Sequence, residues 1–591
     1  MTTFEQHIIL SFGYDDLVGI ANSGGIERIK KEIKKYNLYA ILTTAAKISM
    51  TLSSGGLPNP VAQATILSGV FPDYQQRINY YEIARAKANG MPWTIFNNQG
   101  ILTLVKLAIL NCPEDKGLDM TPVEIERLGY WLLIINDEMF VDESGVNILL
   151  PDLKADRERL RAALARYQFF QDSERFAYKI ARYKWIVDYL RKTKIHKIDV
   201  DALFKEATGL ILDDYLVVCT ALVTKWINIH NKKPDITKDW VTCKQYLRKL
   251  ILPWSKVDEI LEYLFMEPKD YASKHLESIQ ILEGKDYLYY NFLPFIWKPL
   301  IRQNGTDCFV CPSYEYMYDK VTQGVYREIE TYLRRSKQKK VRQSFSIAWG
   351  DAFEKHIYNS LENIFGSSFI ANPKDEDGRE VIDGMVDSDS FVFLIETKNH
   401  HWKYNAMLSG SKELMKSSLN HLFAEKGLKQ ITTCIQKIKN NKFKPKIKVK
   451  YKWIIPIIVV SENIPQDPYN RKLYEEVAAE ANSISNDRQV LPFIILTAEE
   501  VEMLEALHQK LGPIKIGEIL SEYSLIYIKK DSHGIVKEAI SFKNHLYHRG
   551  YEKYEKSTNN FRLMRIFNDF YEDISMKAFG THLKPMRIKK Y

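Results

Sequence analysis

The spacing of apolar residues changes along the chain, from a helical period in its first part to a strand period further on. Up to about Lys269, apolar positions recur every three or four residues, which is the spacing of one face of an α-helix. The segment LGYWLLIIND, which begins at Leu128, is apolar on all sides and predicts a buried helix. We expect residues 1–270 to form a helical N-terminal region, and residues 271–343 to form a connecting hairpin, a helix and a basic linker.

Residues 381–401 have the period of two that is typical of β-strands. Two apolar runs, residues 381–386 and 391–395, flank a cluster of Asp and Ser, residues 387–390, whose side chains favour a turn. Alternation places Val392 and Leu394 on one face of the second run and the neighbouring Phe393 on the other. The pattern predicts a hairpin whose second strand is central and covered on both sides.

Three charged residues lie where this apolar hairpin ends. Glu396 and Lys398 follow the second run on one strand face, and Asp383 lies in the first run. A hairpin symmetrical about residues 388 and 389 places Asp383 opposite Leu394, with Glu396 as its diagonal neighbour. Two carboxylates and one ammonium group are therefore expected to converge.

Such a trio suits metal-assisted hydrolysis of a phosphodiester. Asp383 and Glu396 supply the hard oxygen ligands preferred by Mg²⁺, or by Mn²⁺ in its place, and Mg²⁺ takes only one or two protein carboxylates beside water and substrate phosphate. Lys398 is expected to orient the attacking water and to offset the charge that develops on phosphorus.

The segment resembles the PD-(D/E)xK nuclease superfamily, which has the restriction-endonuclease-like fold. Its signature is an Asp followed on the next strand by Glu-x-Lys, here Asp383, Glu396 and Lys398, with Ile382 where the family name has proline. The superfamily core runs helix, three strands, helix, strand (αβββαβ). Segments with matching patterns are a helix at 349–365, a first strand at 367–372, a second helix at 425–439, and strands at 452–460 and from 490.

The resemblance has consequences for fold and chemistry. It implies an α/β nuclease-like domain at residues 344–510, followed by a helical C-terminal extension at 511–591, and hydrolysis that leaves a 5′-phosphate, most often on DNA. It makes Glu354 the acidic residue of the first helix, able to bind metal directly or through water. Some branches carry Gln-x-x-x-Tyr on the second helix, where this chain has Gln430 followed by Cys434. Gln430 remains a candidate site residue.

A lysine-rich stretch follows the second predicted helix. Residues 437–452 contain no acidic residue, and their lysines could neutralise backbone phosphates without sequence preference. The equally weighted alternative is a solvated loop or a charge-protected edge strand. The candidate nucleic-acid contacts are Lys437, Lys439, Lys442, Lys444, Lys446, Lys448 and Lys450.

Composition limits the class of protein and its location. The chain has 591 residues, a formal net charge of +9 and six cysteines, which fits a multidomain cytoplasmic protein without a disulfide framework. Cys308 and Cys311 form one CxxC that lacks the further ligands of a zinc site. The longest apolar runs are too short for a membrane span, and no phosphate-binding glycine loop is present.

Three questions remain open at the level of sequence. The nuclease-like domain is either active on DNA, active on RNA, or a silent nucleic-acid-binding or scaffold module. The helical N-terminal region is expected to sense or dock something, either a second copy of the chain or a partner protein. By analogy of architecture alone, such a combination resembles bacterial restriction or anti-phage defence nucleases.

Overall fold

The computed structural model describes most of the 591 residues. The described ranges are 10–11, 13–18, 25–52, 60–88, 93–114, 116–139, 157–169, 175–231, 242–287, 289–303, 305–425, 427–444, 452–481, 487–530, 535–536, 540–551 and 560–580. Among these residues, no single helix is both long and apolar enough to cross a membrane, although the bent pair Ile195–Thr208 and Leu212–Trp226 meets the test by length and composition.

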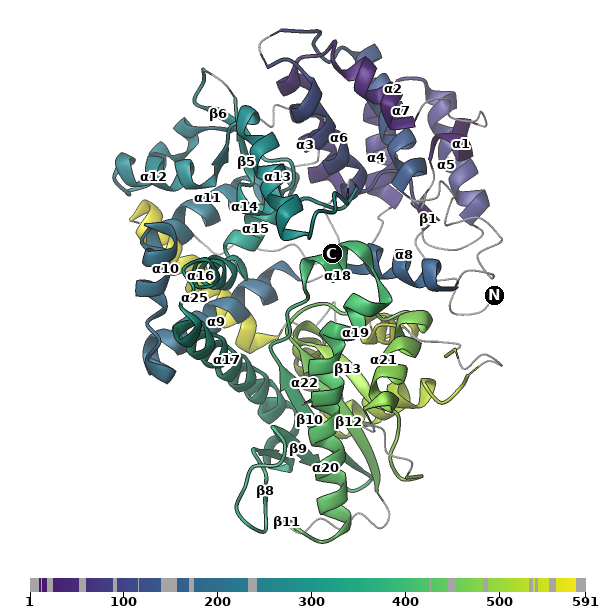
Figure 1. Ribbon diagram of the computed structural model, residues 1–591, viewed down its shortest axis with the longest axis vertical. Coiled ribbons are helices and arrows are strands. Elements are labelled where there is room, and N and C mark those ends of the chain that lie inside the picture. The colour runs from purple at the N-terminus through teal and green to yellow at the C-terminus, as the bar shows by residue number, and fades with distance from the viewer. Residues whose placement is uncertain are drawn as a thin grey trace.

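The first part of the chain is a helical unit with its own core, at the top of Figure 1. Its central helices α3 and α6 pack against each other, and α6 also packs against α7, so that Ile41, Leu104 and Leu133 have no exposed surface. Strands β1 (Leu10–Ser11) and β2 (Trp93–Thr94) pair in parallel. The helices are α1 (Tyr14–Val18), α2 (Gly25–Ile33), α3 (Leu38–Leu52), α4 (Pro60–Val70), α5 (Tyr74–Ala88), α6 (Asn98–Asn111) and α7 (Pro122–Met139).

A second helical layer connects this unit to the rest of the molecule. It contains α8 (Arg157–Phe169), α9 (Phe176–Thr193), α10 (Val200–Thr208), α11 (Leu212–Asn231), α12 (Trp254–Leu264), α13 (Tyr271–Ile281), α14 (Leu293–Trp297), α15 (Tyr314–Lys320) and α16 (Gly324–Arg335). A four-stranded sheet of order β3-β6-β5-β4 lies beside it. Its strands are β3 (Thr242–Cys243), β4 (Phe265–Met266), β5 (Leu300–Arg302) and β6 (Cys308–Val310).

The largest sheet has five strands in the order β13-β12-β10-β9-β7 and lies in the lower half of Figure 1. Strand β10 is central: it runs antiparallel to β9 and parallel to β12, which in turn runs parallel to β13. The strands are β7 (Phe369–Ala371), β9 (Gly384–Asp387), β10 (Phe391–Lys398), β12 (Trp453–Val460) and β13 (Ile494–Thr497). A separate antiparallel pair is formed by β8 (Lys374–Asp375) and β11 (Phe443–Lys444).

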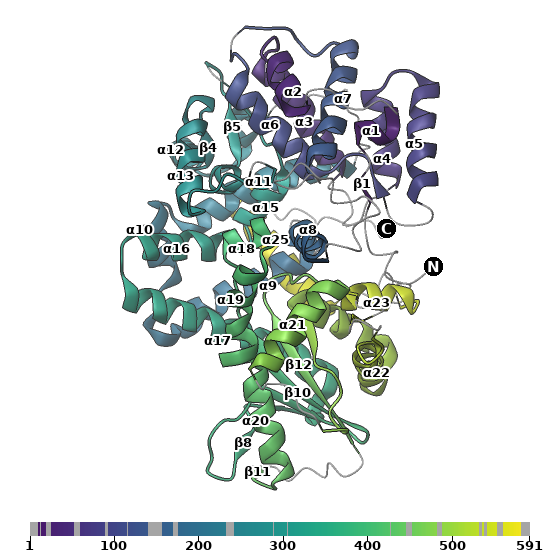
Figure 2. The same ribbon diagram turned by 45° about the vertical axis from the view of Figure 1, so that its right-hand side comes forward.

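Helices cover both faces of this sheet, as the alternation along β10 predicted. Val392 and Leu394 belong to the core shared with α19 (Lys412–Asn420), α20 (Gly427–Lys439) and α21 (Pro468–Glu480). Phe393 and Ile395 point the other way, into the core shared with α17 (Lys339–Phe365) and α22 (Ala498–Ile526). Helix α18 (Tyr404–Ser409) follows β10 on the side toward α8, as the turned view in Figure 2 shows.

The C-terminal helices pack back onto the helical layer. Helix α22 is interrupted at Gly512, which has a positive φ of 76° and precedes Pro513. Helices α23 (Phe542–His548) and α25 (Phe561–Phe579) follow, and α25 packs on α9 and α11. The core that includes α9, α11 and α25 is continuous with the one on the α17 side of the large sheet.

Several predicted elements are confirmed and others are corrected. The strand expected at 452–460 is confirmed as β12, and Thr497 and Glu500 form a capping box at the start of α22. The helix expected at 349–365 is longer, because α17 begins at Lys339 and absorbs part of the basic linker. The hairpin expected at 287–313 exists only as β5 and β6, since residues 293–297 form α14.

The expectation that the cysteines form no disulfide is wrong for one pair. Cys243 and Cys308 are directly opposite each other on β3 and β6 and form a disulfide across the two strands. No local pattern indicates this pairing, because 65 residues separate the two positions. Cys311, the other half of the CxxC, is buried and unpaired.

Candidate active site

The candidate site lies at the carboxyl end of β10, where Asp383 approaches from the segment before β9. The pairing of Leu394 with Met385, and of Ile395 with Gly384, means that the next step of the register brings Asp383 opposite Glu396. The predicted partner, Leu394, was wrong by two positions. The turn is centred on Asp389 and Ser390, because the backbone N–H of Ser388 donates to the carbonyl of Phe391.

The predicted trio is brought together. The ammonium of Lys398 donates to Oε1 of Glu396 and lies 3.8 Å from Oδ2 of Asp383. Glu396 has no exposed side-chain surface, whereas Asp383 and Lys398 each retain 16%. The two carboxylates therefore share one counter-charge at the rim of a buried core, and only Asp383 and Lys398 can be reached from solvent.

Neighbouring groups fix the position of Asp383. Its Oδ2 accepts hydrogen bonds from the backbone N–H of Thr397 at 2.7 Å and from the Thr397 hydroxyl at 2.8 Å. Its backbone carbonyl accepts from Tyr358 at 2.5 Å and from the N–H of Asn372 at 2.8 Å. Asp383 is thus held from the β10 side through its carboxylate and from the β7 side through its carbonyl.

Glu354 approaches the trio from α17, as the resemblance implied. Burial and the negative charge of Asp383 raise the pKa of Glu354 to about 7, against a hydrogen bond from Tyr358. The residue lies one helical turn before Tyr358, so both side chains project from the same face of α17 toward the end of the first hairpin strand. Glu354 is half-buried, with 23% of its side chain exposed.

The electrostatics of the site favour a bound cation. Burial and the charge of Asp383 raise the pKa of Glu396 to about 8, although Lys398 acts in the opposite direction. Burial lowers the pKa of Lys398, but the carboxylates of Asp383 and Glu396 outweigh it, and the net shift is upward. Burial and the repulsion between neighbouring carboxylates both favour the protonated form of these groups. A divalent cation reverses the effect of that repulsion, because its charge favours the ionised carboxylates that bind it.

Two further acidic residues, which sequence reasoning missed, add to this negative field. Burial and the charge of Asp383 raise the pKa of Glu380, which lies three residues before Asp383, and Asp351 contributes to the same shift. Asp351 precedes Glu354 by three residues on α17 and pairs with His196 at 2.8 Å. The spacing of Asp351 and Glu354 on one helix face was the signal that could have shown them as neighbours.

Gln430 lies on α20, the helix that packs on β10 and β12. Its side-chain oxygen is buried and has no hydrogen-bond partner within the part of the chain that the structure describes. Cys434, one turn further along, is close enough for the charge of Glu396 to contribute to a pKa raised to about 12, mainly by burial. Gln430 is therefore on the helix face turned toward the sheet, without a bond to the trio.

The described part of the lysine run is largely paired. Lys437 forms an ion pair with Asp375 at 2.7 Å, and Lys439 forms one with Asp487. Lys444 donates to the backbone carbonyl of Glu376 at 3.1 Å. Lys442 is exposed and has no side-chain partner in the described ranges. Lys446, Lys448 and Lys450 lie outside the described residues.

The donor set at the site fits a hard divalent cation. Asp383 and Glu396 offer carboxylate oxygens, and Oε2 of Glu396 is buried without a hydrogen-bond partner. Mg²⁺ requires only one or two such ligands and fills the rest of its shell with water and substrate oxygens. No group of three or more His, Cys, Asp or Glu side chains among the described residues is close enough to form a complete protein cage for a metal.

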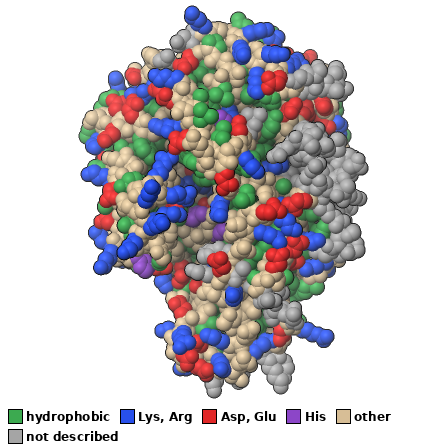
Figure 3. Space-filling view, viewed as in Figure 1, with side chains coloured by type: hydrophobic (Ala, Val, Ile, Leu, Met, Phe, Trp, Pro, Cys, Tyr) green, Lys and Arg blue, Asp and Glu red, His purple; other side chains and the backbone are tan. Residues whose placement is uncertain are grey.

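On the face drawn in Figure 3, Lys and Arg side chains gather on the left-hand flank, interspersed with Asp and Glu. In the basic run that joins α16 to α17, Arg334 and Arg342 both pair with Glu330. Comparisons with protein-family models, with curated proteins and with solved structures found no match to this chain.

Proposed function

We propose that the chain is a metal-dependent nuclease that hydrolyses phosphodiester bonds, with DNA as its substrate. The observation that carries the proposal is the convergence of Asp383, Glu396 and Lys398 at the solvent-facing end of a central strand. The order of elements supports it: α17, β7, β9, β10, α20 and β12 follow one another as helix, three strands, helix, strand. The insertions are the short strands β8 and β11, which pair with each other, and short helices after β10.

Each residue has a distinct role in this proposal. Asp383 and Glu396 hold Mg²⁺ or Mn²⁺, and Thr397 keeps Asp383 oriented by engaging only its Oδ2, so that its other oxygen is left for the cation. A bound divalent ion supplies Lewis acidity and an activated water. Lys398 then moves from Glu396 toward the attacking water and the substrate phosphate, where its charge offsets that of the pentavalent transition state. Glu354 completes the acidic rim.

The test is cleavage by the purified full-length chain. Supercoiled plasmid, linear duplex, single-stranded DNA and RNA are incubated with Mg²⁺, with Mn²⁺ or with EDTA, and Asp383→Asn serves as the matched variant. The expected result is divalent-dependent cutting of DNA that the variant lacks. Glu413→Gln, an exposed carboxylate on α19, controls for loss of surface charge.

Other outcomes separate the alternatives. Cutting of RNA alone keeps the chemistry and changes the substrate. Tight binding of nucleic acid without cutting of any substrate, equal with Mg²⁺ and with EDTA, replaces the proposal with that of a silent nuclease-fold binding or scaffold protein. Equal cutting by the wild type and by Asp383→Asn removes Asp383 from the site.

A further inference from the structure

A cavity of about 200 Å³ lies where the large sheet meets the helical part of the molecule. One wall is formed by residues just beyond the carboxyl ends of three parallel strands: Trp402 and Tyr404 after β10, Glu462 after β12, and Thr497 at the end of β13. The opposite wall comes from α6, α9, α15 and α16. Ligands of open α/β sheets bind at this edge, outside the carboxyl ends of the strands.

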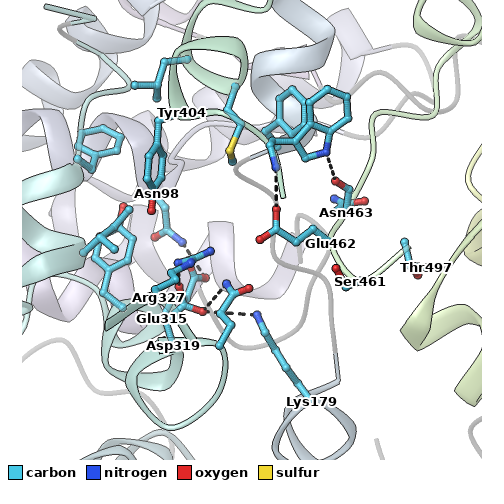
Figure 4. A pocket seen from close by; sticks show the side chains of 18 of the residues that line it. Asn98, Lys179, Glu315, Asp319, Arg327, Tyr404, Ser461, Glu462, Asn463 and Thr497 are labelled. Atoms are coloured by element: carbon cyan, nitrogen blue, oxygen red, sulfur yellow. Dashed lines mark hydrogen bonds and ion pairs between the residues drawn. The ribbon is translucent and has the colours of Figure 1, made fainter. Parts of the chain in front are cut away.

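The charged side chains that line the cavity do not balance. The carboxylates are Glu315, Asp319, Glu462, Glu499 and Glu500, and the Lys and Arg cations are Lys179, Arg327 and Lys543, which leaves an excess of two carboxylates. Figure 4 shows several of these groups turned toward the same space. His401 bonds Glu462, and burial raises the pKa of Glu500, which favours its protonated form. The carboxylates still outnumber the Lys and Arg side chains of the lining, which disfavours an anionic ligand.

The cations on the helical wall are already engaged. Asp319 accepts from Arg327 at 2.8 Å and from Gln323 at 3.0 Å, and Lys179 lies 3.6 Å away from it. One carboxylate thus draws together the positive groups of α9 and α16. A polyanionic ligand would have to compete with Asp319 for both cations while facing the remaining carboxylates.

Glu462 is an acidic group of the wall formed at the strand ends. Its carboxylate accepts from Nδ1 of His401 at 2.8 Å and from the backbone N–H of Trp402 at 3.3 Å. Burial raises its pKa, but His401 and the more distant Arg327 outweigh this and lower the pKa to about 2, so the group stays ionised. Its side chain remains 16% exposed, and among the described residues no Lys or Arg forms an ion pair with it.

Aromatic rings form much of the remaining surface. Trp402 and Phe169 meet edge to face at 4.9 Å between centroids, and Tyr183, Tyr290 and Tyr404 line the cavity with them. The faces of such rings attract ammonium and guanidinium groups within about 6 Å. The same rings provide no ligands for an inorganic ion, and no group of three or more His, Cys, Asp or Glu suited to a metal occurs among the described residues.

We propose that this cavity binds a small organic cation, an amine or guanidinium compound, between the aromatic rings and the carboxylate of Glu462. The aromatic rings, the partly exposed carboxylate of Glu462 and the position at the carboxyl ends of β10, β12 and β13 carry the proposal. It does not depend on the nuclease activity, since none of the residues of the trio lines the cavity.

Matched probes test the charge of the ligand. Binding of phenethylamine and agmatine to the full-length chain is measured by calorimetry and by thermal shift, against 2-phenylethanol as the neutral counterpart of phenethylamine and adenosine monophosphate as an aromatic anion. Sodium chloride at equal ionic strength is the blank. We expect at least one of the two cations to bind, and phenethylamine to bind about tenfold more tightly than the alcohol or better, which corresponds to about 1.4 kcal/mol.

Variants locate the binding at this cavity. Glu462→Gln is expected to weaken cation binding about tenfold, and Tyr404→Leu to weaken it as well, whereas Glu413→Gln on the exposed face of α19 leaves it unchanged. Circular dichroism of each variant shows whether it is folded, and Tyr404→Leu decides the matter if Glu462→Gln is not. The proposal is overturned if neither cation binds at millimolar concentration, if the alcohol or the nucleotide binds as well, or if folded variants bind like the wild type.

Discussion

Lys398 and Glu396 stand two residues apart on the same strand and form an ion pair in which the carboxylate has no exposed surface. Removing only Lys398 leaves the buried carboxylate of Glu396 without its counter-charge. Such a change typically costs about 3–5 kcal/mol of stability unless the carboxylate takes up a proton. Replacing the glutamate by glutamine keeps the shape and removes the charge. The two substitutions therefore distinguish a loss of chemistry from a loss of folding.

Glu396→Gln is expected to lower nuclease activity about 100-fold or more while leaving the melting temperature without metal unchanged or higher. The reason is that an amide neither binds Mg²⁺ as a charged ligand nor repels Asp383. Plasmid cleavage and differential scanning calorimetry on the same preparation check both parts. A variant that cuts at the wild-type rate would show that Glu396 holds no metal.

The contribution of Glu354 and Glu396 to the stability of the metal-free protein is expected to fall as pH rises from about 5 to about 8. The folded-state pKa of Glu354, about 7, and of Glu396, about 8, lie above the ordinary value of 4.5, so the folded state holds protons that the unfolded state has released. The stabilisation that these two protonated carboxyl groups give to the folded state is fully present below pH 4.5. It is lost as the pH rises through their folded-state pKa values, by at most about 1.4 kcal/mol per pH unit for each group.

Urea unfolding at a series of pH values, in EDTA, measures this slope. Glu396→Gln should change the pH dependence relative to the wild type, with a smaller loss of stability between about pH 5 and pH 8, because one of the carboxyls with a raised pKa is gone. In the same pH range, the affinity for Mg²⁺ should rise, since the ion displaces those protons. A wild-type slope identical to that of Glu396→Gln would contradict the buried position of Glu396.

Arg182→Met is expected to destabilise the protein by about 3–5 kcal/mol. Arg182 on α9 pairs in bidentate fashion with Glu502 on α22, at 2.8 and 2.7 Å, and His356 of α17 bonds the same carboxylate at 2.8 Å. Loss of the arginine leaves Glu502 buried with a neutral histidine. The double variant Arg182→Met/Glu502→Gln should recover most of the loss. Arg191→Met, at a partly exposed position of the same helix, should cost less, because its partners Asp201 and Asp213 stay accessible to water.

Reduction of the Cys243–Cys308 disulfide is expected to lower the free energy of unfolding by about 2–4 kcal/mol, because it frees a 65-residue loop in the unfolded chain. Unfolding curves with and without reductant measure the difference, and Cys243→Ser in the absence of reductant should reproduce the reduced curve. Mass spectrometry after alkylation counts the paired thiols. If all six cysteines react without reductant, the pair is open in solution.

Lys442→Ala should reduce the salt dependence of duplex binding by about 0.9 in the slope of log K against log salt concentration, the value for one phosphate contact. Lys442 is chosen because it is exposed, whereas Lys437 is held by Asp375. Lys437→Ala serves as the comparison and should change the slope less. Equal slopes for the wild type and Lys442→Ala would favour the solvated-loop interpretation.

The sequence predicted which side chains of the hairpin converge better than it predicted the register of the two strands. The alternation of apolar residues predicted that β10 is a central strand and that Glu396 and Lys398 lie at its end. This prediction succeeded because successive side chains of a strand point to opposite faces, and both faces of β10 are buried. The register depended on the turn, where a shift of its centre by one residue moved the partner of Asp383 by two. Among four consecutive Asp and Ser residues, all of which favour turns, no local signal selects the centre.

Contacts between segments far apart in the sequence could not be predicted, for a different reason. Glu502 lies 320 residues from Arg182, and nothing in the local pattern of α22 shows that its glutamates turn inward. A charged residue on a helix is predicted to face solvent when only the local sequence is considered. This prediction fails where a side chain from a distant segment pairs with the charged group and allows it to be buried. The sequence pattern did not reveal the cavity beside β10 either, because its walls come from six separate elements or more.

The glutamates of α22 also decide how the protein can be divided. Glu505 is bound by Asn560 and Arg562 from the C-terminal helix, as Glu502 is by Arg182 from the N-terminal half. A fragment trimmed to residues 344–510 would keep these carboxylates and lose their partners, with several ionised groups left facing an exposed apolar surface. We expect such a fragment to be insoluble, so that the nuclease-like part can be produced only together with the segments that flank it.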